Sequence, residues 1–543
     1  MTGEKRQIGV YWVVITLLLL LCLARGISTV RGLNLPGDID SFRDIGYVQG
    51  FLDGNFLGDT HYLGEFRFYP PLEHAGAAIV AWLAGLSPMI LWLQASPFLN
   101  LLAPLAFAEM CRRLFDLQTA VACMAVFVLV NGFTGAPWVA GGYTPWPFVS
   151  NLALPLFFAG VALIYGRIDD LRLGSSVLIG LIIGLSFLAH PWPGILLATI
   201  FTVTSFYYNG FGGKSLSRVG VAALPALALS LLVLGPLVIQ YHLHARNLAP
   251  GSWLDPALDL TLAQLNAGKL ILFVFNVLGF LAGSVLFVYR QRLSQADKKN
   301  TAILLAWVST CSILILRHTF CSWTELSVCR ISIVPIHHAH LYLQAAWSCI
   351  LGVALSSLAQ RGSSWLSSFN LSCEMRRVVT VTSIAVISIV TVELIYRFLH
   401  RGYDLAARQV AAGERGIDMK AYRWMLENTR PDDLFVTEET DLDKPSTVIA
   451  SGRKLVSLPL YFSNPYVNWD ERDQRRKLYL NALRDPHQSL CSLRNESSAT
   501  REAWFFVGND MPVVSPRVKA AYRTEFNTVY RVTESCERKT GIP

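Results

Sequence analysis

Residues 37–74 read GDIDSFRDIGYVQGFLDGNFLGDTHYLGEFRFYPPLEH, and this stretch directly follows the first long apolar run of the chain. It carries seven carboxylates against two arginines and two histidines. Carboxylates at this density beside a bilayer are costly unless they are solvated, paired or used in chemistry. We therefore expect a functional site in this stretch, which is called the acidic loop below.

The first half of the acidic loop has the pattern of an amphipathic helix. Apolar residues recur at helical spacing after Ser41, with charged residues between them: Phe42, Ile45, Val48 and Leu52. This pattern predicts a helix that lies on the membrane surface. Asn55 and Gly58 would end the helix, and Pro70-Pro71 would stop the chain before the next apolar run.

The composition is that of a membrane protein. Of the 543 residues, 53% are hydrophobic and only 15% are charged, whereas soluble domains carry about a quarter charged residues. The mean hydropathy is +0.41. The net charge of +8 comes from Lys and Arg in short linkers between apolar runs, which is typical of topology signals rather than of nucleic acid binding. The ten cysteines form no C-x-x-C pair, and those in apolar runs are expected to be buried.

Eleven apolar runs are long enough, or nearly so, to cross about 30 Å of hydrocarbon as helices. The first, residues 8–24, is not followed by a small-residue cleavage site, so we expect it to remain as a span with its N-terminus inside. The others lie at residues 97–114, 119–134, 150–166, 174–189, 193–208, 219–240, 270–289, 301–317, 339–358 and 378–398.

Residues 75–93 are apolar too, and their path decides the topology. If they do not cross the membrane, all the basic linkers fall on one side of it; if they cross, every later linker moves to the other side. The positive-inside rule therefore favours a re-entrant or surface-lying helix, with a full span as the alternative. The acidic loop and the C-terminal tail would then share the outer face.

The composition becomes ordinary and polar near residue 400. We expect a membrane domain over residues 1–401, in which the outer loop 27–96 carries the catalytic acids, and a soluble extracytoplasmic domain over residues 402–543.

The tail alternates predicted strands at 433–437, 504–507 and 528–532 with amphipathic helical stretches, which predicts a small α/β domain with its own core. In an oxidising compartment Cys491 and Cys536 are candidates for a disulfide, and Cys321 with Cys329 is a second candidate pair.

The acidic loop resembles the GT-C superfamily, the polytopic glycosyltransferases that use lipid-phosphate sugars as donors. Arabinosyltransferases, protein mannosyltransferases and aminoarabinose transferases are of this kind. The resemblance rests on an acidic pair after the first span, a surface helix, a Gly-Asp step and Tyr69-Pro70-Pro71-Leu72 opening an apolar segment. It is close over the first fifth of the chain and architectural elsewhere. In that superfamily an acidic residue of the first outer loop is the catalytic carboxylate, which implies Asp40 or Asp38 here. Soluble tails in the superfamily help to bind acceptor, and a scaffold role for this tail is the alternative.

Sugar transfer requires a carboxylate that takes the proton from the attacking acceptor hydroxyl. Asp40 is preferred for this role over Asp38. Alternatively, one of the two only caps the helix that begins near Ser41. The pair could also hold Mg²⁺ or Mn²⁺ together with waters, although Asp-x-Asp alone is a weak metal signal.

Cations at the membrane surface would hold the leaving phosphate, whose charge grows as the bond breaks. The candidate phosphate or substrate ligands are Arg67, Arg330, His337, His338, His340, Arg317, His190, Glu73 and His74. Arg330 is preferred because it stands alone in an otherwise apolar stretch. Residues 337–340 read HHAH at the entrance of a span, and zinc binding or packing at the membrane interface are the alternatives for these histidines.

The sequence thus predicts an α-helical polytopic membrane protein with about eleven spans, acting as a glycosyltransferase on the outer face of a bacterial plasma membrane. Its donor would be a polyprenyl-phosphate sugar, and its acceptor a glycan, a lipid or a protein. The alternative is a transporter or flippase of lipid-linked glycans. Transporters place ionisable residues near the bilayer midplane, and the predicted spans contain almost none, so the enzyme is favoured.

Overall fold

The structure is a computed structural model. It describes residues 2–36, 39–130, 142–146, 148–170, 172–247, 295–323, 337–368, 373–413, 417–438, 443–497 and 501–536. The chain divides into two compact units. The first unit comprises Met1–Arg31, Ala95–Leu232 and Trp253–Ala406, and the second comprises Gly32–Gln94, Val233–Ser252 and Ala407–Pro543. The acidic loop therefore belongs to the same unit as the tail.

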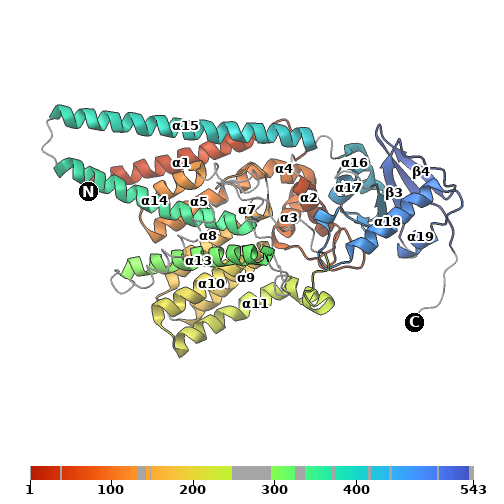
Figure 1. Ribbon diagram of the computed structural model, residues 1–543, viewed down its shortest axis with the longest axis horizontal. Helices are drawn as coiled ribbons and strands as arrows, with labels where there is room; N and C mark the ends of the chain where they lie inside the picture. The colour runs from red at the N-terminus through yellow and green to blue at the C-terminus, as the bar shows by residue number, and fades with distance from the viewer. Residues whose placement is uncertain are drawn as a thin grey trace. The chain divides into compact units, whose positions relative to one another are not determined.

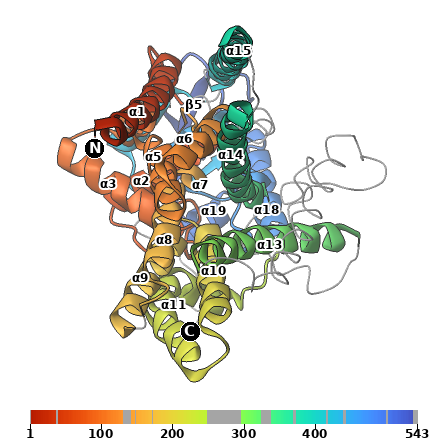
Figure 2. The same ribbon diagram turned by 90° about the vertical axis from the view of Figure 1, so that its left-hand side faces the viewer.

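The first unit is a helical bundle (Figures 1 and 2). The described helices that lie wholly or mostly in it are α1 (Thr2–Val30), α5 (Leu102–Leu114), α6 (Leu117–Ala125), the π-helical turn η1 (Val126–Val130), α7 (Val149–Leu152), α8 (Leu154–Arg167), α9 (Leu173–Ala189), α10 (Pro191–Asn209), α11 (Gly213–Tyr241), α13 (Gln295–Trp323), α14 (His337–Ser368) and α15 (Cys373–Gly413). Helices α8, α9, α10, α13 and α14 pack in succession, and α14 also packs on α6.

Large aromatic side chains hold the centre of this bundle. Phe157 on α8 meets Trp307 of α13 and Tyr342 of α14 edge to face, with ring centroids 4.7 and 4.9 Å apart. Such pairs add to the free energy gained from apolar burial. The cysteines of the apolar runs are buried as predicted: Cys22, Cys111, Cys123, Cys311 and Cys349.

Within the residues that the structure describes, seven helices are long and apolar enough to cross a membrane: Ile8–Val30, Pro88–Leu114, Val149–Arg167, Gly213–Tyr241, Lys298–Arg317, Leu341–Arg361 and Val381–Leu399. The predicted runs near 119–134 and 174–189 correspond to shorter apolar helices, and the run 270–289 lies outside the described residues. The apolar segment after the acidic loop is broken into α3 (Leu72–Ala84) and α4 (Pro88–Leu99) by Gly85, which has the left-handed φ of 64°. At about 1.5 Å per residue, the 13 residues of α3 are too few to cross the bilayer alone.

The second unit contains a five-stranded mixed sheet with the order β2-β1-β3-β5-β4. The strands are β1 (Leu434–Thr437), β2 (Lys454–Leu455), β3 (Ala503–Gly508), β4 (Val518–Arg523) and β5 (Asn527–Val532). Strand β1 is parallel to β2 and β3, whereas β5 is antiparallel to β3 and β4. The helices of the tail are α16 (Met419–Asn428), α17 (Asp443–Ala450), α18 (Trp469–Arg484) and α19 (Cys491–Glu496). The predicted α/β tail is thus confirmed.

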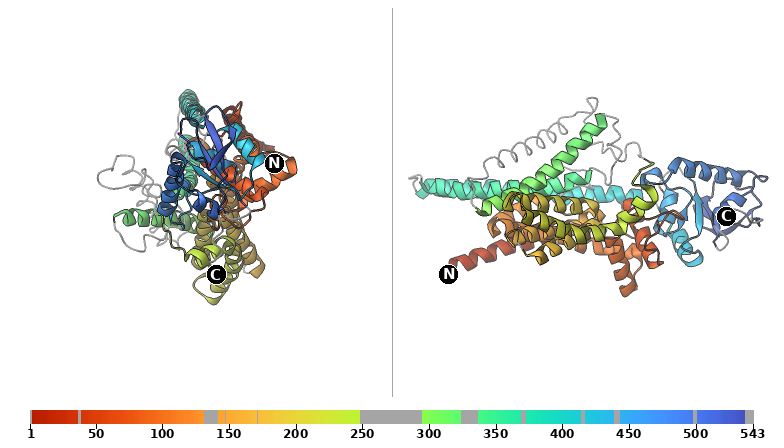
Figure 3. Two further views of the ribbon diagram at one scale, coloured as in Figure 1. Left: turned by 90° about the vertical axis from the view of Figure 1, so that its right-hand side faces the viewer. Right: turned by 90° about the horizontal axis from the view of Figure 1, so that it is seen from below.

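The two faces of the sheet have separate cores, because side chains alternate along each strand. Leu434 and Val436 pack with residues of α18 and α19 on one face. Phe435 packs with residues of α16 and α17 on the other face, and Tyr62 of the acidic loop belongs to that same core. In Figure 3 (left) the blue strands have helices on both sides.

Helix α2 (Ile39–Leu52) begins the acidic loop and packs against both α3 and α17. Its apolar residues Phe42, Ile45 and Val48 are buried as their spacing requires, but the polar face is largely buried too. The predicted helix is therefore present and packs against protein on more than its apolar face, while its position on the membrane surface stays a prediction. Gly46 shows why the packing is close: a Cβ there would lie 2.1 Å from the backbone oxygen of Ile449 on α17.

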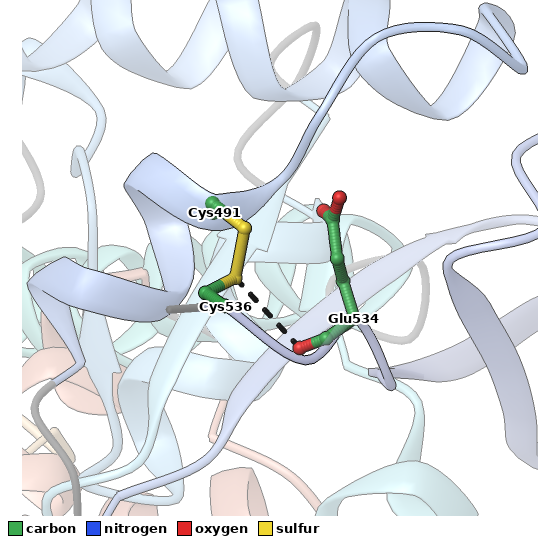
Figure 4. Close-up of side chains that lie close together, drawn as sticks. All are labelled: Cys491, Glu534 and Cys536. Atoms are coloured by element: carbon green, nitrogen blue, oxygen red, sulfur yellow. Dashed lines mark hydrogen bonds between the residues drawn. A yellow bond between two sulfur atoms is a disulfide. The ribbon is translucent and has the colours of Figure 1, made fainter. Parts of the chain in front are cut away.

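A disulfide joins Cys491 and Cys536 in the tail, as predicted (Figure 4). It ties the start of α19 to the segment that follows β5, and the Cys536 sulfur also lies 3.8 Å from the backbone oxygen of Glu534. The second predicted pair, Cys321 with Cys329, falls on residues whose side chains lie outside the described part of the structure.

Candidate functional site

The first turns of α2 hold a cluster of charges around the Arg43 guanidinium. Arg43 Nη1 donates to Asp40 Oδ1 at 3.0 Å, while Nε and Nη2 both donate to Asp44 Oδ1 at 3.1 Å. The helix places Asp40 three and four positions from Arg43 and Asp44, so the three side chains share one face. Nη2 also donates to the Tyr69 hydroxyl at 3.1 Å, and the guanidinium lies over the Tyr69 ring, 4.5 Å from its centroid.

The start of α3 completes this cluster. His74 Nε2 lies 3.3 Å from Asp44 Oδ1, and its Nδ1 lies 3.2 Å from the carbonyl oxygen of Pro70. Both carboxyl oxygens of Glu73 are buried and have no hydrogen-bond partner among the described residues. The residues Asp40, Arg43, Asp44, Tyr69, Glu73 and His74 are called the Arg43 cluster below.

The environment shifts the three carboxyl groups in different directions. Burial raises the pKa of Asp40, and Arg43 only partly opposes this. Burial would also raise the pKa of Asp44, but the Arg43 charge and the hydrogen bond from His74 outweigh it and hold that pKa below its ordinary value. Burial, with Asp44 nearby, raises the pKa of Glu73 well above its ordinary value. Asp40 keeps about a quarter of its side chain exposed and can still meet a substrate.

A stacked pair of tyrosines separates the Arg43 cluster from Arg67. The Tyr47 and Tyr69 rings lie 5.5 Å apart and nearly parallel. Arg67 lies on the Tyr47 side, 5.4 Å from that ring and 4.0 Å from the Phe51 ring. Arg67 Nη2 donates to the Asn55 carbonyl oxygen, whereas Nε and Nη1 are buried and have no partner in the described part of the chain. Burial lowers the pKa of Arg67 to about 10.

The second half of the acidic loop is bound to the tail. Asp53 pairs with Arg453 at 3.1 Å, and Glu65 pairs with Arg472 at 2.6 Å. Asp59 Oδ2 accepts a hydrogen bond from Asn464 at 3.0 Å. These contacts join residues about 400 positions apart in the sequence, and they are called the loop–tail contacts below.

The predicted site residues lie in the acidic loop, in the first unit or outside the described residues. Asp40, Glu73 and His74 come together in the Arg43 cluster, and Arg67 lies beyond the tyrosine stack. His190, Arg317 and His338 belong to the first unit, where the His190 and His338 rings lie 4.4 Å apart. His190 caps α10, and its Nδ1 accepts a hydrogen bond from the backbone N–H of Trp192. Asp38 and Arg330, and the side chains of His337 and His340, lie outside the described residues.

Asp38 and Asp40 were predicted as possible ligands of Mg²⁺ or Mn²⁺, and of these two residues the structure describes Asp40. Asp40 Oδ1 is paired with Arg43, so at this oxygen a cation is already supplied by the chain itself. Among the described residues, Cys491, Glu534 and Cys536 are close enough together to hold a metal, but the disulfide engages both sulfurs. Binding of Mg²⁺ or Mn²⁺ by Asp38 and Asp40 stays a prediction.

Three members of the Arg43 cluster were not predicted as site residues from the sequence: Arg43, Asp44 and Tyr69. A signal for the first two was present, since Asp40, Arg43 and Asp44 stand at i, i+3 and i+4 of one predicted helix. The contribution of Tyr69 and His74 depends on the path of the chain between α2 and α3, which periodicity does not specify.

No protein-family model and no curated protein matches this sequence. Among solved structures, the chain is similar to ArnT from Cupriavidus metallidurans, both in the apo state and bound to undecaprenyl phosphate. The TM-scores are 0.54 and 0.53 at 14% identity, over 96% of this chain and 98% of that chain. It is also similar to the oligosaccharyltransferase AglB from Archaeoglobus fulgidus, in complex with an inhibitory peptide and a dolichol-phosphate. There the TM-score is 0.50 at 13% identity, over 91% of this chain and 69% of that chain. At these identities the likeness establishes the fold alone: the predicted helical membrane fold followed by an α/β tail is shared with these proteins.

Proposed function

We propose that this protein is a membrane glycosyltransferase that moves a sugar from a polyprenyl-phosphate donor to a glycan, lipid or protein acceptor on the outer face of a bacterial plasma membrane. The observation that carries the proposal is the fold shared with ArnT over almost the whole chain, together with Asp40 partly exposed in the acidic loop. The solved neighbours support a lipid-phosphate donor, because one is bound to undecaprenyl phosphate and another to a dolichol-phosphate.

Asp40 is the general base in this proposal. Its raised pKa makes it a better proton acceptor than an ordinary aspartate. The acceptor hydroxyl gives its proton to Asp40 while its oxygen bonds to the anomeric carbon of the sugar. The bond from that carbon to the phosphate oxygen breaks, and its electron pair leaves with the polyprenyl phosphate. Arg43 holds the carboxylate in place through Oδ1, and Oδ2 accepts no hydrogen bond from the described residues.

The leaving phosphate needs cationic or N–H donors. Arg67 suits this role because the N–H groups of two buried nitrogens, Nε and Nη1, lack acceptors among the described residues. Arg317, His190 and His338 are proposed as further substrate contacts in the first unit, together with Arg330, His337 and His340. The tail is proposed to face the same side as the acidic loop, which is supported by the loop–tail contacts.

The test is sugar transfer by the purified protein in nanodiscs, with a panel of labelled polyprenyl-phosphate sugars and a mixed glycan acceptor. Asp40→Asn should lower turnover by about 10²-fold or more with donor binding retained, because the amide cannot accept the proton. Asp38→Asn is run beside it to separate the two acids of the pair. Asp485→Asn, an exposed helix-end residue of the tail, is the matched control and should turn over like the wild type.

In the wild type, turnover should fall as the pH drops, because Asp40 becomes protonated. This acid limb should begin above the ordinary pKa of aspartate, since burial raises the pKa of Asp40. Undiminished transfer by Asp40→Asn would move the chemistry elsewhere. Absence of transfer with every donor, together with flux of lipid-linked sugar across the same membranes, would favour a transporter instead.

A further inference from the structure

The two ring nitrogens of His74 both face hydrogen-bond acceptors. Nδ1 lies 3.2 Å from the Pro70 carbonyl oxygen, and Nε2 lies 3.3 Å from Asp44 Oδ1. A carbonyl oxygen can only accept a hydrogen bond, so Nδ1 must carry a proton. A neutral imidazole has a single N–H, and Nε2 would then be a bare nitrogen facing a carboxylate oxygen.

Asp44 cannot supply the missing proton at this contact. The same oxygen, Oδ1, already accepts hydrogen bonds from Arg43 Nε and Nη2, and an arginine stays protonated in proteins. Arg43 and His74 also hold the pKa of Asp44 below its ordinary value. With Asp44 ionised, the hydrogen on the His74–Asp44 contact has to come from Nε2.

Charge balance in the buried cluster leads to the same assignment. Arg43 contributes one positive charge, and Asp40 and Asp44 contribute two negative ones when Asp40 is ionised as the base, so the three together carry −1. Glu73 is buried without a partner among the described residues and is favoured in its neutral form. A charged His74 brings the cluster to zero, which lowers the cost of burying it.

The other neighbours of the His74 ring are aromatic. On α2 it meets the Tyr47 ring besides Asp44, at 5.1 Å between centroids. Tyr69 lies edge-on at 5.7 Å, and Trp92 of α4 stacks on the imidazole at 5.8 Å with an interplanar angle of 7°. The aromatic face of Trp92 favours a cation over a neutral ring.

We propose that His74 is held as an imidazolium and acts as a positioning residue: it fixes Asp44, Asp44 fixes Arg43, and Arg43 orients the carboxylate of Asp40. This role rests on the proposed function of Asp40. The chain of contacts runs through hydrogen bonds of 3.3, 3.1 and 3.0 Å. Without the His74 charge, Asp44 would lack a donor and the cluster would carry an unbalanced negative charge, so the carboxylate of Asp40 would be held less firmly.

The protonation state can be read without any sugar transfer. In protein labelled with ¹⁵N-histidine, His74→Gln identifies the His74 signals by difference. We expect both nitrogens of His74 to be protonated at neutral pH, while the exposed His487 gives a solvent-exposed reference. Asp44→Asn should remove the second proton from His74 at the same pH. One protonated and one bare nitrogen in the wild type would overturn the proposal even if the enzyme is active.

The positioning role is tested by the kinetics of turnover. His74→Gln can still donate to Asp44 but carries no charge, so it should lower kcat by about 10-fold and leave KM for the donor unchanged. It should also move the acid limb set by Asp40 to higher pH, because a positive charge near that carboxylate is lost. An unchanged kcat together with an unmoved acid limb would show that His74 does not position Asp40. If no donor is turned over by the wild type, the proposed function fails, and the NMR result still decides the charge of His74.

Discussion

The two halves of the acidic loop use the same residue types in opposite ways. In the Arg43 cluster the charges pair with neighbours one to thirty positions away, and one carboxyl group, Glu73, is left without a partner among the described residues. In the loop–tail contacts the carboxylates pair with a domain about 400 positions away. Density of carboxylates therefore marks a region, and only the identity of the partner separates a reactive group from a structural one.

The largest expected effect comes from removing the arginine that binds the carboxylates of each half, which is Arg43 for the first half and Arg472 of the tail for Glu65 in the second half. Arg43→Gln should lower turnover by about 10²-fold, because Asp40 loses the guanidinium that orients it. Arg472→Gln, which removes the partner of Glu65, is the matched variant and should change turnover by less than about 3-fold. Initial rates of sugar transfer at saturating donor measure both. Equal losses would mean that the two halves are one functional unit.

The loop–tail contacts should contribute to the free energy of unfolding rather than to turnover. Arg453 is almost fully buried and also donates to Thr429 and to the Ser451 carbonyl oxygen, besides pairing with Asp53. Arg453→Met should lower the free energy of unfolding by about 3–5 kcal/mol, because it leaves a carboxylate and carbonyl groups without partners. Thermal unfolding in detergent followed by fluorescence measures this change.

The control for that variant is an exposed pair in the same domain. Arg531 binds Glu502 through two hydrogen bonds but keeps about half of its side chain exposed. Arg531→Met should cost less than about 1 kcal/mol. If Arg531→Met lowered the free energy of unfolding as much as Arg453→Met does, burial would not be the reason that the loop–tail contacts stabilise the fold.

Periodicity was sufficient for helix α2 of the acidic loop and for three strands of the tail. The predicted strands at 433–437, 504–507 and 528–532 correspond to β1, β3 and β5, because buried strands are nearly continuous apolar runs. Strand β4 was missed, since it is an edge strand with Lys519 and Arg523 among its exposed residues. The pairing of Asp53 with Arg453 could not be predicted either, because no local pattern links residues so far apart. The same limit applies to the packing of α2 against α17, which brings Gly46 close to Ile449.

The smallest expected effect is the change in melting temperature on replacing Glu73, and its sign should be opposite to that of the matched variant in the other half. Burial raises the pKa of Glu73 in the folded protein, so the folded state binds a proton more tightly than the unfolded state. The stability that this proton contributes is complete below the unfolded pKa, near 4.5, and is lost as the pH rises through the folded pKa. Glu73→Gln does not titrate, so it should raise the melting temperature by a few degrees at neutral pH, and this gain should shrink as the pH approaches the unfolded pKa.

The matched variant in the other half is Glu65→Gln. It should instead lower the melting temperature, because it breaks the contacts of Glu65 with Arg472 and Tyr241. Melting curves of both variants between pH 5 and pH 8 (roughly the range in which folded proteins are most stable) measure the two signs. A melting temperature that falls in both variants would place Glu73 among the paired carboxylates and remove the distinction between the halves.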